Sequence, residues 1–343
     1  LRAIRNGKMD LIEAEAVNAL ITSRTRNVVP HLNKHLNGSL TERFTGLQDK
    51  YAKIKALFEA SIDFSDSDSI SPDILAQGMD SLNKLAGELK ELVDSFRLGA
   101  ILTAGFHIAI VGKPNVGKSS LLNMVLKKER SIVTEYAGTT RDILKEEVSI
   151  GGYDVCLYDT AGIRKTEDHI EKLGIKKVDE LMNDAHLIIF IMDLSMPPDS
   201  EDMEIARLLS ERKKQVLVFF NKTDKGKIDG HEKVAESSGA LTAFEGSITN
   251  ENGLDDLLGH IKEKLDTMIS HAPENMIFSS RQRWILRQVS VRNAEILGKD
   301  VIKETDISSY ILDEILELLE ELTGSGKSFD LQGYIFDNFC IGK

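Results

Sequence analysis

The sequence predicts an α/β domain inserted into a discontinuous all-α domain, and two changes of pattern along the chain carry this prediction. Apolar residues recur at spacings of three and four in residues 1–102 and again in 271–343, as on one face of a helix. Between these blocks, residues 103–270 alternate short β-rich segments with helical patterns, which is typical of a mainly parallel, doubly wound sheet. The simplest arrangement packs the two helical blocks together as one domain.

Each block contains recognisable elements. In the first, apolar stripes cover residues 12–20, 40–58 and 75–96, and the acidic, Ser-rich stretch 63–72 is a predicted loop. Stripes of this length favour packing within one chain over an intermolecular coiled coil. In the middle block, strands are expected at 106–111, 155–158, 187–192 and 216–220, with a hairpin at Gly151-Gly152 and a closing helix at 254–265. The last block predicts helices over 283–297 and 310–322.

Net charge, cysteine count and hydropathy limit the kinds of protein that this sequence can encode. A net charge of −12 argues against a broadly basic nucleic-acid-binding surface, so any such contact needs a local patch or a partner. Two cysteines cannot form a disulfide framework, which favours a reducing compartment, and no apolar run reaches membrane-spanning length. We therefore expect a cytoplasmic protein without membrane contact. Because the chain starts at Leu1 with no Met and no signal peptide, we also expect a segment before it.

A phosphate-binding loop occupies residues 112–119, which read G-K-P-N-V-G-K-S between a predicted strand and a predicted helix. Gly112 and Gly117 allow the backbone to wrap around a phosphate chain, while Lys118 should reach the β- and γ-phosphates and the Ser119 hydroxyl should hold Mg²⁺. A second Gly-rich stretch, T-G-S-G-K-S at 323–328, follows a helix instead and has Glu321 in place of the first glycine. We interpret it as an interhelical turn.

Further motifs follow predicted strands at the edge where such sheets bind ligands. D-T-A-G starts at Asp159, which can hold Mg²⁺ through water, and Thr140 of the segment G-T-T-R-D should complete the metal shell. N-K-T-D starts at Asn221, and its Asp224 carboxylate can accept from both guanine N1–H and N2–H, which adenine does not offer. A backbone amide at Ser247 or Ile248 can recognise guanine O6. Together these motifs predict a Ras-like P-loop GTPase domain that binds GTP and GDP.

With these residues together, the chain resembles the MnmE (TrmE) family of tRNA-modification GTPases. The likeness runs from the N-G-K-M-D-L opening through G-x-P-N-x-G-K-S-S, G-T-T-R-D and D-T-A-G-I-R to the terminal F-C-I-G-K. It implies a K⁺-activated, homodimeric GTPase that works with an FAD-dependent partner, MnmG. Together such proteins install a carboxymethylaminomethyl group on the wobble uridine of certain tRNAs. The resemblance also implies a folate-binding N-terminal domain ahead of this chain.

The resemblance assigns roles that the motifs alone leave open. Ile163 stands where many GTPases place a water-orienting Gln, and Glu167, Asp168 and Glu171 are candidate replacements; the family points to Glu171.

The resemblance also implies a K⁺ site made by Asn115, Thr134, Tyr136 and Thr139, although Asn115 could instead only shape the loop. Cys340 matches a family position near the modification centre, and Lys343 and Lys8 match positions near a 5-formyl-tetrahydrofolate-type cofactor. The expected GTP-binding residues are Asn115, Val116, Gly117, Lys118, Ser119, Ser120, Thr134, Glu135, Tyr136, Ala137, Gly138, Thr139, Thr140, Asp159, Thr160, Ala161, Gly162, Asn221, Lys222, Asp224, Ser247 and Ile248.

Two other classes of protein compete with this interpretation. A regulatory GTPase of the ribosome-assembly type shares the phosphate loop, the N-K-x-D motif and often the hydrophobic residue after D-x-x-G, but it lacks the F-C-I-G-K tail and the split helical domain. A helical scaffold with an inert nucleotide domain would not need Lys118, Ser119 and Asp159 intact.

Overall fold

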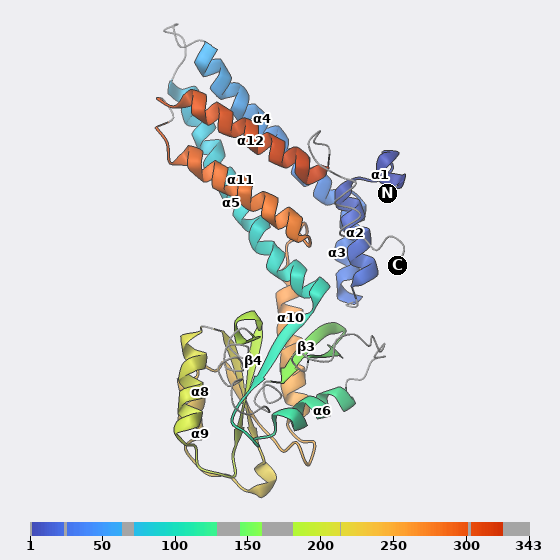
Figure 1. Cartoon of the computed structure of the whole chain (residues 1–343), viewed down its shortest axis with the longest axis vertical. Helices are drawn as coiled ribbons and strands as arrows, with labels where there is room; N and C mark the ends of the chain where they lie inside the picture. Colours follow the sequence, from blue (N-terminus) through green and yellow to red (C-terminus); the bar gives the residue numbers. More distant parts are fainter. Residues whose placement is uncertain are drawn as a thin grey trace, which may run out of the picture. The chain divides into compact units, whose positions relative to one another are not determined.

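The computed structural model of the chain describes residues 2–23, 26–63, 72–128, 145–159, 181–212, 214–300 and 303–324. The chain divides into two compact units (Figure 1), one made of Leu1–Thr103 with His271–Lys343 and the other of Ala104–Ser270. The first unit is helical and the second contains a six-stranded sheet. The predicted fold class, an α/β domain inserted into a discontinuous all-α domain, is therefore confirmed.

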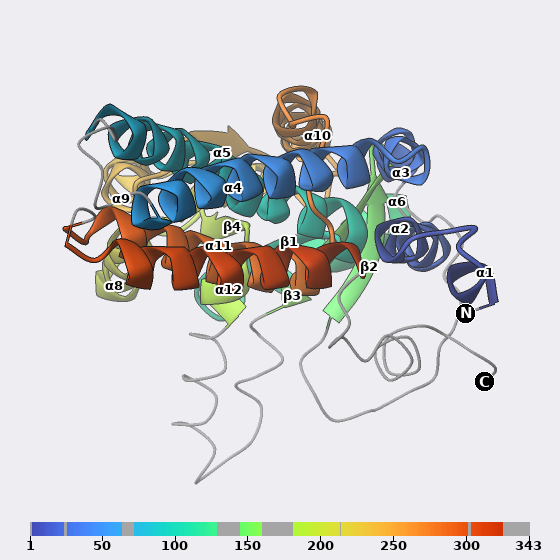
Figure 2. The same ribbon diagram turned by 90° about the horizontal axis from the view of Figure 1, so that it is seen from above.

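The helical unit combines elements from both ends of the chain. From the N-terminal stretch come α1 (Arg2–Arg5), α2 (Leu11–Thr22), η1 (Arg26–Val28), α3 (Val29–Leu36), α4 (Ser39–Asp63) and α5 (Pro72–Ala104); the C-terminal stretch adds α11 (Ser280–Leu297) and α12 (Thr305–Thr323). The four long helices α4, α5, α11 and α12 lie side by side in both views (Figures 1 and 2). Their apolar stripes meet in one core, in which Phe44 and Leu47 belong to the same cluster as Val289 and Ile315.

A close backbone approach marks the region where the two stretches of the helical unit meet. A Cβ on Gly99 of α5 would lie 2.1 Å from the Ile277 carbonyl oxygen, so only glycine fits there. One helical turn earlier, the buried Ser95 hydroxyl accepts a hydrogen bond from the Ile277 amide at 3.2 Å. The segment that enters α11 is therefore fixed against α5 by main-chain contacts.

A buried hydrogen-bond chain crosses the core of the helical unit. The Tyr51 hydroxyl of α4 donates to Asn293 Oδ1 of α11 at 2.9 Å, and Asn293 Nδ2 donates to the Leu82 carbonyl of α5 at 3.1 Å. Both side chains are almost fully buried, and burial raises the pKa of the Tyr51 hydroxyl, which stays protonated as a donor. The Tyr51–Asn293 pair thus connects three helices from the two stretches of chain.

We expect Tyr51→Phe to destabilise the helical unit by roughly 1–3 kcal/mol, because Asn293 Oδ1 loses its donor inside the core. The measurement is urea unfolding followed by fluorescence of Trp284, the chain's single tryptophan, which lies on α11 and reports on this unit. Tyr310→Phe is the control, since Tyr310 is 65% exposed. Equal unfolding midpoints for the two variants would contradict the assignment.

The α/β unit is a six-stranded sheet with helices. Its strand order is β2-β3-β1-β4-β5-β6, and every neighbouring pair is parallel except β2 with β3. The strands are β1 (Phe106–Val111), β2 (Lys145–Ile150), β3 (Tyr153–Asp159), β4 (Leu187–Asp193), β5 (Gln215–Asn221) and β6 (Thr242–Glu245). The helices are α6 (Lys118–Lys128), α8 (Ser200–Glu211), α9 (His231–Ser237) and α10 (Leu254–Ser270), with a 3₁₀ turn η3 (Thr223–Lys225).

The predicted hairpin is confirmed, since Gly151 and Gly152, both with positive φ, join the antiparallel β2 and β3. Helix boundaries differ more. The closing helix runs to Ser270, beyond the predicted end at 265, because a last turn with half-buried Met268 and Ile269 continues past the final fully buried residue, Leu265. Similarly, α11 and α12 begin earlier than predicted, before their first buried apolar residues. No helix in the described part of the chain is long and apolar enough to cross a membrane.

Candidate nucleotide site

The carboxyl ends of the parallel strands bring the predicted motifs to one edge of the sheet. β1 runs into the phosphate loop, and β3, β4 and β5 end at Asp159, Asp193 and Asn221. In the sheet register Ile110 faces Asp159, and Asp193 faces Asn221. The motifs for phosphate, metal and base are thus neighbours in space although they are far apart in sequence.

Lys118 lies over the phosphate loop as the first residue of α6. Its ammonium donates to the Gly112 carbonyl at 2.7 Å and to the Lys113 carbonyl at 2.6 Å, and the residue is buried. An ammonium carries three N–H donors, so this placement keeps a positive charge at the centre of the loop. The N-terminus of α6 adds the partial positive charge of its backbone amides. This is the geometry that binds phosphate groups.

Ser119 and Asp159 meet beside the loop. The Ser119 hydroxyl donates to Asp159 Oδ2 at 2.5 Å, and Asp159 is 1% exposed. A hydroxyl and a carboxylate at this separation are the hard oxygen ligands that suit Mg²⁺, which takes few protein ligands and retains waters. The two residues therefore fit the predicted role in metal binding.

Asn221 joins the base motif to the phosphate loop. Its Nδ2 donates to the Val116 carbonyl at 2.8 Å, and its Oδ1 accepts from the Ile248 amide at 3.0 Å. The side chain is buried, so it depends on both bonds. Asn221 also explains why residue 117 is a glycine. At its φ of +114°, a Cβ on residue 117 would lie 2.4 Å from Asn221 Nδ2.

Lys222 makes a second connection to the loop. Its ammonium donates to the Asn115 carbonyl at 2.8 Å and to Asp193 Oδ2 at 2.5 Å. Asn115 and Lys222 both have left-handed backbone conformations, with φ of 62° and 66°. Such conformations are uncommon outside glycine and mark positions where the surrounding contacts dominate. The base motif therefore holds the loop at Asn115 through the Lys222 ammonium.

Asp193 is a site residue that the sequence analysis missed. Burial favours its neutral form, but hydrogen bonds from Lys222 and from the Ser195 hydroxyl and amide outweigh that effect and lower the pKa of the carboxyl group. It is thus an anion that positions Lys222. The available signal was an acidic residue directly after the apolar run 187–192, which matches the places of Asp159 and Asn221 at the ends of β3 and β5.

Lys113 was also missed. Its ammonium contacts Oδ2 of Asp199, the N-cap of α8, at 2.7 Å and Oδ2 of Asp202, in the first turn of α8, at 2.6 Å. Burial opposes the charged form, but the hydrogen bonds that the ammonium donates to the two carboxylates raise the pKa of Lys113. Asp199 also caps α8 in a capping box with Asp202. Nothing in the sequence spacing predicts this contact.

The base-recognition residues are close together. The Ser247 hydroxyl donates to Asp224 Oδ1, which lies on the exposed turn after β5. The two amides considered for guanine O6 already donate within the protein: Ser247 N to Asn252 Oδ1 and Ile248 N to Asn221 Oδ1. Recognition of O6 by either amide would therefore require it to share or exchange its acceptor.

The other predicted site residues are not part of the geometry given above. Residues 134–140 and 160–162, together with Ile163, Glu167, Asp168, Glu171, Cys340 and Lys343, lie outside the described residues. Lys8 lies in the exposed turn between α1 and α2, in the helical unit. Of the predicted turn at 323–328, the described residues include only Thr323 and Gly324. There α12 ends, and Gly324 caps it with φ of +79°.

Comparison with known proteins agrees with the geometry. The family model of the MnmE helical domain matches residues 11–340. The tRNA modification GTPase MnmE of Finegoldia magna is 36% identical over 348 residues, covering 100% of this chain and 75% of that protein. The protein of the same name from Aquifex aeolicus is 36% identical over 349 residues, with the same coverage. The chain belongs to the MnmE family.

The resemblance noted from the motifs is thus confirmed. Among solved structures, the G domain of the T. maritima FeoB iron transporter aligns with 48% of this chain and 99% of that one, at 24% identity and a TM-score of 0.34. That likeness is too low to bear on function. The MnmE relatives, in contrast, match the helical stretches as well as the nucleotide domain, since the matched region extends over the whole chain.

We expect Gly117→Ala to weaken GDP binding by at least about 10-fold, because the new methyl group would displace the Asn221 amide from the loop. Isothermal titration with GDP measures the effect. Gly226→Ala is the matched control: Gly226 also has positive φ, but nothing lies within 4 Å of its Cβ position. Equal GDP affinities for the two variants would contradict the role given to the close contact between residue 117 and Asn221.

Proposed function

We propose that this MnmE-family chain hydrolyses GTP in a cycle activated by K⁺-dependent pairing of two nucleotide domains. In this proposal it acts with an FAD-dependent partner of the MnmG type to introduce a carboxymethylaminomethyl group at the wobble uridine of tRNA. The relatives that cover the whole chain are named tRNA modification GTPases. The observation that carries GTP binding is the assembly at one sheet edge of Lys118, the Ser119–Asp159 pair and Asn221.

Each residue at the edge has a chemical role in this proposal. Lys118 and the amides of the loop bind the β- and γ-phosphates, where negative charge accumulates on the leaving group. Ser119 and Thr140 would hold Mg²⁺, with Asp159 acting through water, and the ion when bound neutralises phosphate charge. Lys222 and Asn221 keep the loop in its binding conformation through the contacts described above.

Base selection is assigned to Asp224, whose position is secured by the Ser247 hydroxyl. Asp224→Asn should shift preference from GTP toward xanthosine triphosphate, because the C2 carbonyl of xanthine can accept from the new amide. Competition binding of GTP, xanthosine triphosphate and ATP measures this preference. Asp229→Asn, on the nearby exposed turn, is the control. Equal binding of ATP and GTP by the unaltered chain would remove the assignment.

Water activation is assigned to Glu171, since Ile163 has no polar atom with which to orient water. Glu171→Ala should lower hydrolysis by roughly 10²-fold or more while nearly preserving GTP affinity, the pattern of a lost general base. Single-turnover hydrolysis and nucleotide titration separate the two effects. Glu167→Ala and Asp168→Ala serve as controls. A silent Glu171→Ala with a strong effect of either control would move the role to that carboxylate.

A K⁺ ion held by Asn115, Thr134, Tyr136 and Thr139 would supply positive charge near the β/γ-bridge that other GTPases obtain from arginine. Because Asn115 has a left-handed backbone conformation, the choice of substitution matters for testing this K⁺ site. Ala at this position would add backbone strain, whereas Asn115→Gly removes the side-chain oxygen and retains the backbone conformation.

We expect hydrolysis to be much faster in K⁺ than in Na⁺, and Asn115→Gly to lose most of this difference while retaining its rate in Na⁺. Spin labels on exposed residues of the α/β unit should report pairing of two nucleotide domains with GDP, a transition-state mimic and K⁺, and separation in Na⁺. Equal rates and equal label distances in both salts would favour the ribosome-assembly type of GTPase.

The remaining assignments complete the proposal. In it, the helical domain comprises residues 1–102 with 271–343, and the nucleotide domain comprises residues 103–270. Cys340 belongs to the modification centre, and Cys340→Ser should spare GTP hydrolysis while impairing tRNA modification in cells. Lys8 and Lys343 contribute to a 5-formyl-tetrahydrofolate-type site in a cytoplasmic homodimer.

A further inference from the structure

Helix α11 is strongly basic, although the chain as a whole is acidic. Its sequence, S-R-Q-R-W-I-L-R-Q-V-S-V-R-N-A-E-I-L, contains four arginines and one glutamate, whereas the whole chain has a net charge of −12. The arginines differ in their surroundings. Arg292 forms ion pairs with Glu295 of the same helix and with Glu314 of α12, so its charge is neutralised within the helical unit.

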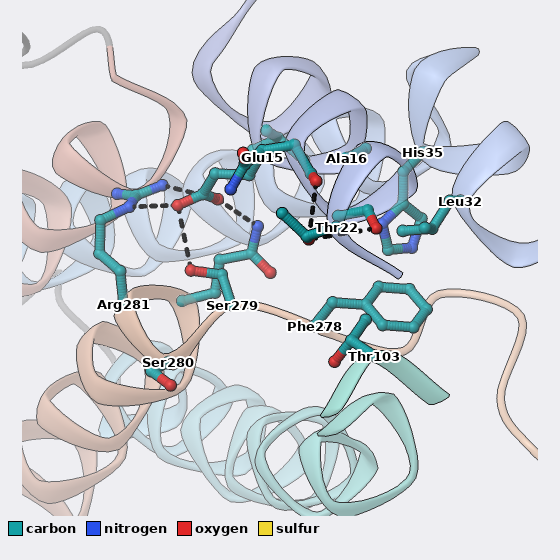
Figure 3. Close-up of a pocket in the computed structure, with 14 residues that line it drawn as sticks. Glu15, Ala16, Thr22, Leu32, His35, Thr103, Phe278, Ser279, Ser280 and Arg281 are labelled. Atoms are coloured by element: carbon teal, nitrogen blue, oxygen red, sulfur yellow. Dashed lines mark hydrogen bonds and ion pairs between the residues drawn. The ribbon is translucent and has the colours of Figure 1, made fainter. Parts of the chain in front are cut away.

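Arg281 is also neutralised, because it lies in the wall of a cavity inside the helical unit (Figure 3). Its guanidinium pairs with Glu15 at 2.8 Å, and Gln282 Nε2 donates to the same carboxylate at 2.6 Å. The cavity has a volume of about 300 Å³, and its lining includes His35 of α3 and Thr103 of α5. Arg281 therefore serves the interior of the unit, which leaves Arg283 and Arg287 as the cations that α11 can offer to a partner.

Arg287 lines a groove between α11 and α5, two helices that lie side by side (Figures 1 and 2). One turn earlier on α11, the Arg283 guanidinium carbon lies 4.7 Å from the centroid of the Phe96 ring of α5. The groove has a volume of about 230 Å³. It is lined by Ala86, Lys90, Val93, Asp94, Arg287 and Ser290.

The groove carries cations that the protein does not neutralise. Lys90 and Arg287 line it, and Arg97 lies on the same face of α5, two turns after Lys90. All three side chains are exposed, and none forms an ion pair with another described residue. Among the described residues in the lining, Asp94 is the only carboxylate. The groove therefore has a net positive charge and favours an anionic partner.

An exposed tryptophan lies beside these cations. Trp284 precedes Arg287 by three residues and Val291 follows it by four, so the three side chains share the outer face of α11. Trp284 is 55% exposed and Val291 is 57% exposed. Proteins that bind single-stranded nucleic acid combine cations for the phosphates with aromatic rings on which unpaired bases stack. The groove offers both kinds of group.

We propose that the groove between α5 and α11 is a docking surface for an unpaired segment of RNA. Lys90, Arg97 and Arg287 contact phosphates, and the Trp284 ring stacks on a base. The choice of RNA over another polyanion rests on the proposed function, in which tRNA is the substrate. The inference goes beyond that function because it names the surface that holds the RNA and the side chains that contact it.

Trp284 is the single tryptophan of the chain, so its fluorescence reports on the groove directly. The full chain is titrated with an RNA hairpin that has an unpaired loop, with a fully paired RNA of equal phosphate number, and with oligoglutamate of equal charge. We expect saturable quenching by the hairpin and little by the other two, because stacking requires an unpaired base. Equal quenching by the paired RNA, or no quenching by the hairpin, would overturn the proposal. Quenching by oligoglutamate alone would indicate an acidic protein partner instead.

Substitutions locate the contact, with binding of a dye-labelled hairpin followed by fluorescence anisotropy. Lys90→Glu and Arg287→Glu should each weaken binding at least about 10-fold, because each places a carboxylate where a phosphate contacts the protein. Arg287→Gln should reduce the slope of log affinity against log salt concentration by about 0.7, the value for one phosphate contact of a single strand. Lys53→Glu, which reverses the charge of an exposed lysine on α4, is the matched control and should bind as the unaltered chain does.

Stacking is tested at Trp284 itself. Trp284→Leu should weaken hairpin binding at least about 5-fold, whereas Trp284→Phe should retain most of the affinity because a phenyl ring still stacks. Equal affinities for these two variants would show that position 284 makes an apolar contact only and would contradict the stacking assignment. Because Trp284 is half exposed, both variants should keep the circular dichroism spectrum of the unaltered chain.

Two further readouts separate this proposal from the proposed function. GTP hydrolysis by Lys90→Glu and Arg287→Glu should be unchanged, since both residues lie in the helical unit. If the hairpin binds but Lys90→Glu, Arg287→Glu and Lys53→Glu all bind it equally well, the RNA docks elsewhere, and this proposal fails while the proposed function stands. If cells lacking the chain retain full wobble-uridine modification, the proposed function fails, whatever the groove binds.

Discussion

The contact between Asn221 and the phosphate loop is the constraint on which the nucleotide site depends. One buried side chain uses its amide nitrogen on the loop at Val116 and its amide oxygen on the turn after β6 at Ile248. The contact is close enough that residue 117 must lack a Cβ. Lys222, oriented by Asp193, adds a second connection at Asn115. The base motif therefore contributes to the shape of the phosphate loop as well as to recognition of the base.

The helical unit follows a similar principle over a longer span of sequence. Residues before and after the inserted α/β unit share one core, and the contacts that join them are buried and specific: Tyr51 with Asn293, Gly99 with Ile277, and Glu15 with Arg281. A buried ion pair is weak evidence for stability, but breaking one partner of such a pair is unfavourable. The Glu15–Arg281 pair thus fixes how α2 meets α11 and α12 beside the cavity.

Local patterns predicted the fold class, the parallel strands and the residues of the phosphate and base motifs, because periodicity and turn chemistry act between near neighbours in sequence. They did not predict Asp193 or the contact of Lys113 with Asp199, since these pairings depend on which strand and helix ends meet across the sheet. The cavity beside His35 and Gln282 was missed for the same reason: its residues come from four separate segments. Helix ends were misplaced where the helix continues past its last fully buried residue, as α10 does after Leu265.

The most direct test of this account uses a ligand that has no base. Mg-pyrophosphate binding is measured by calorimetric titration for the unaltered chain, Asn221→Ala and Asp224→Asn. Because Asn221 holds the loop, its loss should weaken pyrophosphate binding about 10-fold, the scale of one buried hydrogen bond, whereas Asp224→Asn should have no effect. Unchanged pyrophosphate binding in Asn221→Ala would contradict the claim that the base motif shapes the phosphate loop.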